Sequence, residues 1–328
     1  MLEHGGRLRA AAQRFGIPVN DWLDLSTGIA PEPWPVPAIP LDAWARLPED
    51  DDGLEQAACA CYGAAHALPV AGSQAAIQLL PRLLPAGTVG VLAPSYAEHA
   101  QAWQRAGHRL LRLAAGEIEA QLDALDALVL ANPNNPSGRL FAPAQLLDWH
   151  ERLYRRGGCL LVDEAFMDCT PEFSLAAHSD KPGLIVLRSF GKFFGLAGVR
   201  LGFVLAEAEL LEQLRQRLGP WAVSGPARAI GLQALDESSA AARRLRGLRL
   251  QAAGQRLAAL LRERGLAPDG GAALFQWLRI PDAAELHEFL ARRGILVRLF
   301  EQPASLRFGL PGDEAGWQRL AQALDDYR

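Results

Sequence analysis

Two lysines stand in a chain whose other basic residues are all arginine. Of 33 basic residues, only Lys181 and Lys192 are lysine, which leaves 33 − 2 = 31 arginines. Arginine keeps its charge, whereas a lysine amine can lose its proton and attack a carbonyl carbon, so a lysine retained in such a composition is a candidate nucleophile. Lys181 lies in a polar Asp-Lys-Pro-Gly turn, where a solvated charge is the simpler interpretation. Lys192 lies shortly after the apolar run 184–187, and we expect it to be the reactive amine.

Asparagine is nearly as scarce, and three of the four asparagines fall in one loop. They follow the apolar segment 128–131 and alternate with prolines, at Asn132, Asn134 and Asn135. Prolines restrict the backbone of such a loop, so an asparagine amide can be aimed at a ligand oxygen. An ordinary turn is the alternative, but the concentration of asparagine here favours a binding role.

Two further polar groups lie at the ends of predicted elements. Asp163 closes the apolar segment 160–162, where a buried carboxylate is costly unless a cation pairs with it, although it could also cap the next helix. Gly72, Ser73 and Gln74 precede a predicted helix, whose free N–H groups suit a phosphate, although an ordinary serine cap is the alternative.

The segment after Lys192 is rich in glycine and contains Arg200, which could grip a phosphate. Together the clusters match the parts of pyridoxal 5′-phosphate. An amine would hold its aldehyde, a carboxylate its ring nitrogen and an asparagine its phenolic oxygen, while Ser73, Ser189 and Arg200 would hold its phosphate. The sequence therefore predicts an enzyme that uses this cofactor.

The elements that must position these residues alternate between helices and short apolar strands. Helices are expected at 53–62, 74–84, 96–105 and 143–155, and strands at 89–92, 127–131, 160–162, 184–187 and 201–205. Uniformly apolar strands separated by helices predict an α/β fold with a mostly parallel sheet covered on both faces. Ligands bind at the carboxyl ends of such strands, and we expect every one of these polar clusters to fall just after a strand.

The regions before and after this alternating segment have different sequence patterns. We expect an amphipathic helix within residues 1–20, a proline-rich arm at 31–40 and helices through 215–264, interrupted at two Gly-Pro pairs. Strands near 274–280, 296–299 and 305–308 would complete a smaller α/β domain. The predicted division is an N-terminal helix and arm at 1–45 that join the small domain, a large cofactor domain at 46–212, and an interdomain helix with the small domain at 213–328.

Composition narrows the class of protein. The chain has 328 residues, half of them hydrophobic, and a net charge of 33 − 37 = −4, with no basic stripe that would suit nucleic acid. No segment is apolar over the roughly 20 residues of a membrane helix, and the N-terminus has no signal-peptide pattern. Cys59 and Cys61 have the wrong spacing for a zinc site, so we expect no metal and free thiols in a reducing cytoplasm.

Over essentially its whole length, the chain resembles the fold-type I pyridoxal-phosphate enzymes of the class I/II aminotransferase-like group. The resemblance implies that Lys192 is the Schiff-base lysine, Asp163 the ring-nitrogen partner and Asn135 the ligand of the phenolic oxygen. It further implies that Tyr96 stacks on the cofactor ring and that Arg307 binds the substrate carboxylate. It also implies a homodimer.

Two branches of this family resemble the chain. Histidinol-phosphate aminotransferases share the overall pattern, and the threonine-phosphate decarboxylases of cobalamin biosynthesis are closer. The second resemblance rests on His4-Gly5-Gly6 and on the segments 94–98, 163–166, 187–189 and 220–223. Phe166 also stands where the aminotransferases usually have tyrosine. This branch implies a carboxy-lyase acting on a small phosphorylated amino acid, with His4, Gly5, Arg298 and Arg307 as candidate substrate ligands. The aminotransferase reaction remains the alternative, because both reactions begin with the same amine exchange.

The chain also departs from the family at four positions. Gly191 replaces a Ser or Thr that supplies a phosphate hydroxyl, and Leu47 replaces a Tyr that reaches the neighbouring subunit's cofactor. Gly28 and Ala30 stand where the decarboxylases often have asparagines, which puts substrate contacts from that loop in doubt.

Overall fold

A computed structural model describes residues 4–327 of the chain, which divide into two compact units. The large unit comprises Trp34–Asn135 and Leu140–Gly247, and the small unit comprises the chain up to Pro33, Pro136–Arg139 and the chain from Leu248 onward. This division differs from the predicted boundaries at residues 45 and 212. The proline-rich arm belongs with the large unit from Trp34 onward, where the Trp34 N–H donates to Phe194 O, at 2.7 Å, and the Trp34 ring packs edge-on against Phe194.

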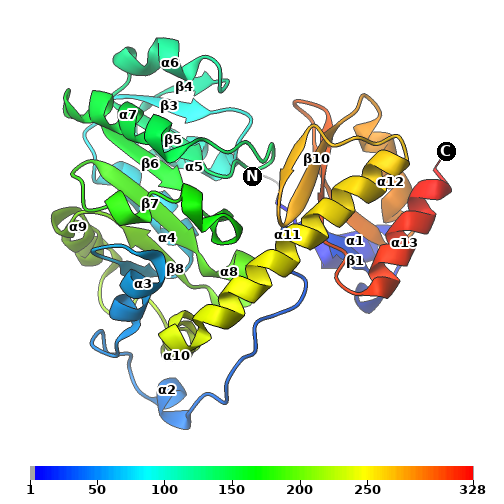
Figure 1. Ribbon diagram of the computed structural model, residues 1–328, viewed down its shortest axis with the longest axis horizontal. Coiled ribbons are helices and arrows are strands. Elements are labelled where there is room, and N and C mark those ends of the chain that lie inside the picture. Colours follow the sequence, from blue (N-terminus) through cyan, green and yellow to red (C-terminus); the bar gives the residue numbers. More distant parts are fainter. Residues whose placement is uncertain (1–3, 328) are drawn as a thin grey trace. The chain divides into compact units, whose positions relative to one another are not determined.

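The large unit is built on a seven-stranded sheet in the order β2-β8-β7-β6-β5-β3-β4. Its strands are β2 (Leu68–Val70), β3 (Thr88–Leu92), β4 (Arg109–Leu113), β5 (Ala127–Ala131), β6 (Cys159–Asp163), β7 (Leu184–Ser189) and β8 (Gly202–Leu205). The strands from β7 to β4 are mutually parallel. At the other edge, β8 pairs antiparallel with β7, and β2 pairs antiparallel with β8. The predicted mostly parallel α/β sheet is confirmed, and its central strands lie side by side in Figure 1.

Helices cover both faces of this sheet. Alternate strand residues such as Val89, Val129 and Leu161 form one core with residues of α4 (Ser73–Leu79), α5 (Ala97–Arg105) and α9 (Ala208–Leu218). On β6, α7 (Pro143–Tyr154) packs with its buried Leu146, Trp149 and Leu153. The remaining helices of this unit are α2 (Leu41–Ala45), α3 (Leu54–Tyr62), α6 (Ile118–Gln121), α8 (Phe190–Phe193) and α10 (Gly225–Leu235).

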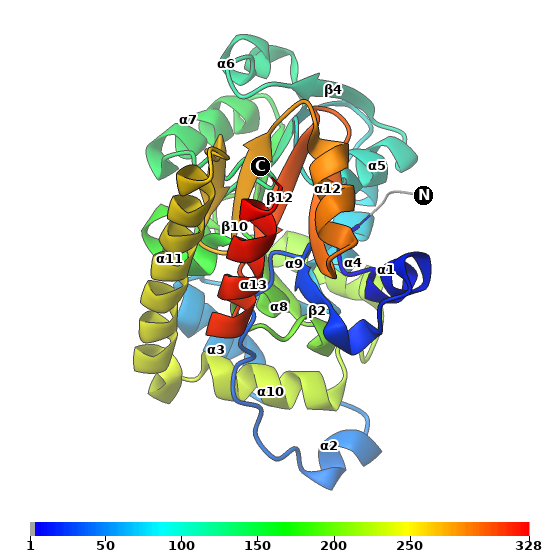
Figure 2. The same cartoon turned by 90° about the vertical axis from the view of Figure 1, so that its right-hand side faces the viewer.

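The small unit contains a five-stranded sheet in the order β1-β11-β12-β10-β9. Its strands are β1 (Leu23–Leu25), β9 (Gly270–Ala272), β10 (Phe275–Arg279), β11 (Ile295–Phe300) and β12 (Ser305–Gly309). The helix α12 (Ala283–Ala291) packs on β11 and β12, and Figure 2 shows it with α13 (Glu314–Asp325) beside these strands. The long helix α11 (Ala240–Glu263) contributes residues to both units.

The amphipathic helix expected within residues 1–20 is shorter than that span. It is α1 (Leu8–Phe15), which ends at Gly16 with φ 69°, and residues 1–3 of the expected span lie outside the described part of the chain. Its apolar side chains Leu8, Ala11 and Phe15 pack against Trp22 and Leu296 in the small unit.

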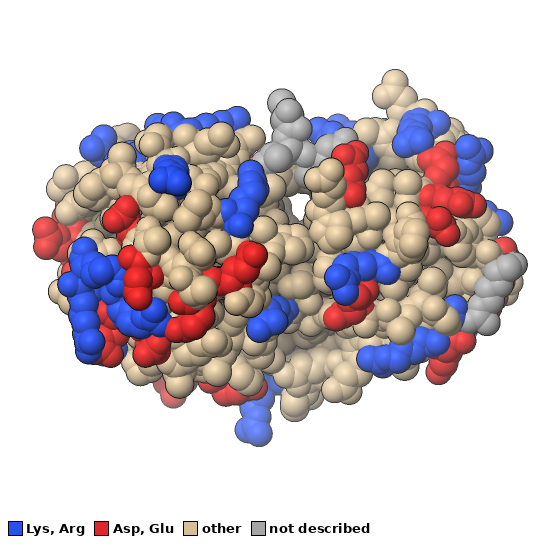
Figure 3. All heavy atoms as spheres, turned by 90° about the horizontal axis from the view of Figure 1, so that it is seen from above, with Lys and Arg blue, Asp and Glu red and all other residues tan. Residues whose placement is uncertain are grey.

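Surface charge is mixed on the face that Figure 3 shows, where acidic and basic side chains lie among one another. None of the helices in residues 4–327 is long and apolar enough to cross a membrane.

Candidate active site

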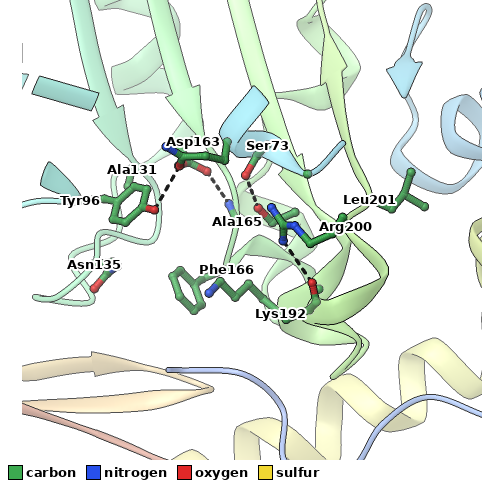
Figure 4. Close-up of a pocket in the computed structure, with 15 residues that line it drawn as sticks. Ser73, Tyr96, Ala131, Asn135, Asp163, Ala165, Phe166, Lys192, Arg200 and Leu201 are labelled. Atoms are coloured by element: carbon green, nitrogen blue, oxygen red, sulfur yellow. Dashed lines mark hydrogen bonds between the residues drawn. The ribbon is translucent and has the colours of Figure 1, made fainter. Parts of the chain in front are cut away.

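A pocket in the large unit collects residues from the carboxyl ends of the central strands and from the first turn of α4 (Figure 4). All nine residues predicted to hold the cofactor line it: Gly72, Ser73, Gln74, Tyr96, Asn135, Asp163, Ser189, Lys192 and Arg200. These residues are spread over more than a hundred positions of the chain, so it is the parallel sheet that brings them together.

Lys192 lies on α8, the short helix that follows β7. Its Nζ atom is 5.7 Å from the centre of the Phe166 ring, toward which the side chain points in Figure 4. The helix is firmly held, because Phe190 is fully buried and stacks on Phe194 at 4.3 Å, while Arg246 donates from Nε to Phe193 O at 2.7 Å. The amine is therefore carried by a rigid turn beside an apolar ring.

Asp163 ends β6 and is only 4% exposed. Its Oδ1 accepts the Ala165 N–H at 3.1 Å, and its Oδ2 lies 2.9 Å from His99 Nε2. The other ring nitrogen of His99, Nδ1, is buried without a hydrogen-bond partner among residues 4–327, so the tautomer with its proton on Nε2 suits this site best. In that tautomer His99 donates to the Asp163 carboxylate.

Sequence reasoning missed His99. The residue is buried on the first turn of α5, three positions after Tyr96. A helix places residues three apart on the same side, so the proximity to Tyr96 was a usable signal. A single histidine on an apolar helix face is, however, more often a satisfied core residue, and nothing else in the sequence marked it.

The residues predicted to bind the cofactor phosphate form a compact set of hydrogen-bond donors. Ser73 and Ser189 have their Oγ atoms 2.7 Å apart. Gly72 has φ 75°, a backbone conformation that favours glycine, and a Cβ atom there would lie 2.5 Å from Arg200 Nη2, so a larger residue would displace this guanidinium. Two hydroxyls and a guanidinium thus converge at the start of α4, which is a donor set suited to a phosphate dianion.

The absent hydroxyl at Gly191 has a steric reason in this chain. A Cβ atom at that position would lie 2.6 Å from the Cα atom of Ala197. Serine or threonine would therefore force the segment around Ala197 to move, and this segment accepts a hydrogen bond from Arg200 Nη1 at 3.1 Å.

The asparagine loop divides its residues between structure and pocket. Asn132 exchanges two hydrogen bonds with the backbone of Phe141, at 2.8 and 3.2 Å. Asn134 donates to Pro94 O at 2.9 Å and accepts from Ser95 Oγ at 2.8 Å. These contacts fix the loop, and Asn135 is the member that lines the pocket.

The four predicted substrate ligands all belong to the small unit. Arg307 is 5% exposed and donates from Nη2 to Ser26 O at 2.7 Å. A Cβ atom at Gly5 would lie 2.2 Å from the same carbonyl oxygen, so His4 and Gly5 lie next to the residue that Arg307 contacts. Arg298 on β11 is the register partner of Arg307 on β12, which places both side chains on one face of the sheet.

A buried ion-pair network behind the pocket was not predicted. Arg188 donates to Glu164 Oε2 at 2.8 Å and to Asp168 Oδ1 at 2.7 Å, and its guanidinium lies 4.4 Å from the centre of the Tyr62 ring. Burial raises the pKa of Glu164, against the pull of the Arg188 cation. Burial alone would lower the pKa of Arg188, but the Asp168 and Glu164 carboxylates raise it.

This network ties together two residues of the pocket. Glu164 follows Asp163 at the end of β6, and Arg188 precedes Ser189 at the end of β7. The Glu164 N–H also donates to Leu187 O at 2.9 Å, which continues the pairing of the two strands. The ion pair therefore fixes the spacing between the Asp163 carboxylate and the Ser189 hydroxyl.

Comparison with known proteins identifies the family. The family model for aminotransferase class I and II matches residues 48–324. A threonine-phosphate decarboxylase of Pseudomonas aeruginosa is 64% identical, over 99% of this chain and 97% of the relative. A threonine-phosphate decarboxylase of Sinorhizobium sp is 46% identical, over 98% of this chain and 97% of the relative.

A solved structure shares the fold. The histidinol-phosphate aminotransferase of Clostridium acetobutylicum superposes with a TM-score of 0.81 at 20% identity, over 93% of this chain and 98% of that one. The chain therefore belongs to the aminotransferase class I and II family.

Proposed function

We propose that this protein is a pyridoxal-phosphate-dependent decarboxylase that converts L-threonine O-3-phosphate to (R)-1-aminopropan-2-yl phosphate for cobalamin biosynthesis. The observation that carries the proposal is the pocket in which Lys192, Asp163 and the Ser73–Ser189–Arg200 donors meet. The identity of 64% to a threonine-phosphate decarboxylase over almost the whole chain supports this substrate rather than histidinol phosphate.

The residues of the pocket fit the cofactor by their chemistry. When bound, pyridoxal phosphate supplies an electron sink for the electron pair that remains when the substrate carboxylate leaves as CO₂. Lys192 is the amine that would hold the aldehyde and, once the substrate amine has replaced it, would carry a proton. Asp163, kept in place by His99 and the Ala165 N–H, offers an acceptor to a protonated ring nitrogen.

Asn135 and Tyr96 are proposed to contact the cofactor ring in different ways. Phe166 has no hydroxyl to offer, so the amide of Asn135 is the proposed ligand for the phenolic oxygen. Tyr96 is proposed to stack on the ring face.

The small unit supports a substrate with two anionic groups. Arg298 and Arg307 are cross-strand neighbours on one face of the small sheet, so two cationic side chains lie where a substrate with anionic groups would be favoured. We propose Arg307 for the carboxylate or phosphate, with His4, Gly5 and Arg298 as further phosphate ligands. Anchoring both anionic groups determines which bond of the substrate faces the electron sink.

We further propose that the protein is a cytoplasmic homodimer. Large apolar side chains are exposed on the arm, on α2, just after α2 and before α10: Val36, Leu41, Trp44, Leu47 and Trp221. Such a group of exposed apolar residues is typical of a surface that another protein covers. All four cysteines are free, which suits a reducing compartment.

A direct assay separates the two reactions. Purified, cofactor-loaded protein is mixed with threonine phosphate or with histidinol phosphate, each with and without 2-oxoglutarate. We expect CO₂ release from threonine phosphate without any 2-oxo acid. Turnover of histidinol phosphate that requires 2-oxoglutarate, with no CO₂ from threonine phosphate, would contradict the proposal.

A further inference from the structure

The segment 94–98 contributes Tyr96 to the pocket, but its last residue, Glu98, does not line the pocket. Glu98 lies on the first turn of α5 and is only 9% exposed. We propose that Glu98 is a positioning residue that sets the orientation of Tyr96 by fixing the amide of Gln74. This inference rests on the proposed function, because it assigns to Tyr96 the role of contacting the cofactor.

Three hydrogen bonds form a chain that runs from Gln78 through Glu98 and Gln74 to Tyr96. The Glu98 Oε2 atom accepts from Gln74 Nε2 at 2.9 Å and from Gln78 Nε2 at 3.1 Å. The Gln74 Oε1 atom accepts in turn from the Tyr96 hydroxyl at 3.2 Å. An ionised carboxylate only accepts, so Gln74 must turn its NH₂ group toward Glu98, and its oxygen then faces Tyr96.

The orientation of the Gln74 amide is the step on which Tyr96 depends. An amide can rotate by half a turn with little change in shape, and the reversed Gln74 would present NH₂ to the Tyr96 hydroxyl. Glu98 prevents this reversal, because the reversed amide would place two oxygens against each other. The Glu98 carboxylate thus determines which way the Gln74 amide points, and therefore which atom of that amide faces the Tyr96 hydroxyl.

The cost of burying Glu98 supports a specific role. A carboxylate withdrawn from water is expensive unless hydrogen bonds compensate, and an apolar side chain would pack α5 on α4 at lower cost. Gln74 and Gln78 lie one turn apart on α4, so the carboxylate also holds the first turns of the two helices together. Since α4 begins at the phosphate donors, Glu98 links these donors to the proposed ring-stacking residue.

The neighbouring residue gives Tyr96 a second support. The Tyr96 and His99 rings meet edge-on with centroids 6.0 Å apart, and the His99 N–H donates to Tyr96 O at 3.2 Å. His99 also contacts Asp163. The ring is therefore held from the His99 side and its hydroxyl from the Gln74 side, so loss of Glu98 should tilt the ring while leaving it in the pocket.

The first test measures cofactor binding and the circular dichroism of the bound cofactor. Glu98→Ala should weaken the dissociation constant of the cofactor about 5- to 10-fold and reduce the visible dichroism by half or more. Glu98→Leu fills the same space without an acceptor and should show the same losses. It therefore serves as the test if the alanine variant fails to fold. Glu98→Gln keeps an acceptor oxygen but can reverse its own amide, so both signals should fall between those of the wild type and of Glu98→Leu. Binding and dichroism unchanged in Glu98→Leu would overturn the proposal.

A double-mutant cycle separates positioning from general packing. Tyr96→Phe keeps the ring but removes the hydroxyl, so Glu98→Leu added to this background should change the cofactor dissociation constant by less than 2-fold. An undiminished effect of Glu98→Leu in that background would show that it acts independently of Tyr96 and would overturn the proposal.

The matched control is Gln78→Ala, which removes the second amide from the same carboxylate without touching Tyr96. We expect it to leave dichroism and cofactor affinity within 2-fold of the wild type. If Gln78→Ala equals Glu98→Leu, loosening of the two helices explains the result and the inference is wrong. Wild-type protein that binds no cofactor would instead contradict the proposed function itself.

Discussion

At the scale of single residues, the pocket depends on the neighbouring residues that hold each proposed functional group in place. Asp163 is useful only while it remains an acceptor facing the pocket, and His99 and the Ala165 N–H keep it there. Lys192 is useful only on a rigid turn, which the buried Phe190 provides. That Lys192 and Asn135 would line a pocket could be predicted from the sequence, because lysine and asparagine are scarce in it. The supporting residues His99 and Glu98 could not be predicted, because closeness to Tyr96 in the sequence does not by itself distinguish a supporting residue from a satisfied buried one.

His99→Phe tests the support of Asp163. A hydrogen bond to a charged group contributes about 1.5–3 kcal/mol, so its loss should lower kcat about 10-fold or more while the protein stays folded. Steady-state kinetics and a thermal melt measure both. His108→Phe is the matched control, since His108 is equally buried but contacts Pro81 O instead. Equal losses of kcat in the two variants would contradict a specific role for His99.

At the scale of elements, the parallel strands could be predicted and the edge strands could not. The segments that became β3, β5, β6 and β7 are buried on both faces and therefore read as short apolar runs. The edge strand β4 reads Arg-Leu-Leu-Arg-Leu, which is neither a continuous apolar run nor a regular alternation, and it was missed. The edge strand β2 contains Pro69, which normally argues against a strand and is tolerated only at an edge.

The ion pair between the ends of β6 and β7 can be tested without any assay of activity. Removing one partner of a buried pair leaves an uncompensated charge, so Arg188→Met should lower the free energy of unfolding by about 3–5 kcal/mol. Adding Glu164→Met should recover part of this loss, since the fully buried carboxylate is then removed and only the partly exposed Asp168 carboxylate is left opposite the methionine. Chemical denaturation measures both. A double variant no more stable than Arg188→Met would show that the pair is not the stabilising unit.

At the scale of the whole molecule, the exposed apolar side chains concern assembly. Trp44 is 65% exposed on α2, and a protein surface seldom leaves a tryptophan and its apolar neighbours in water. Sequence could not identify this surface, because an exposed Leu or Trp looks the same in a sequence as a core one. Only the fold shows that α2 leaves these residues uncovered.

Trp44→Asp should therefore convert the proposed dimer into a monomer. A carboxylate at the centre of an apolar interface would have to be desolvated on assembly, which opposes association. Sedimentation equilibrium should give half the wild-type mass with an unchanged helical dichroism. Tyr154→Asp alters an exposed aromatic on α7 and should leave the mass unchanged. A wild-type protein that is already monomeric would contradict the proposed dimer.

The central claim is that one of the two lysines carries the cofactor. Borohydride reduces the double bond between a lysine nitrogen and the cofactor carbon, and peptide mass spectrometry then locates the attached mass. We predict that mass on the peptide containing Lys192, with none on the peptide containing Lys181. Attachment to Lys181, or to neither peptide in protein saturated with pyridoxal phosphate, would contradict the account.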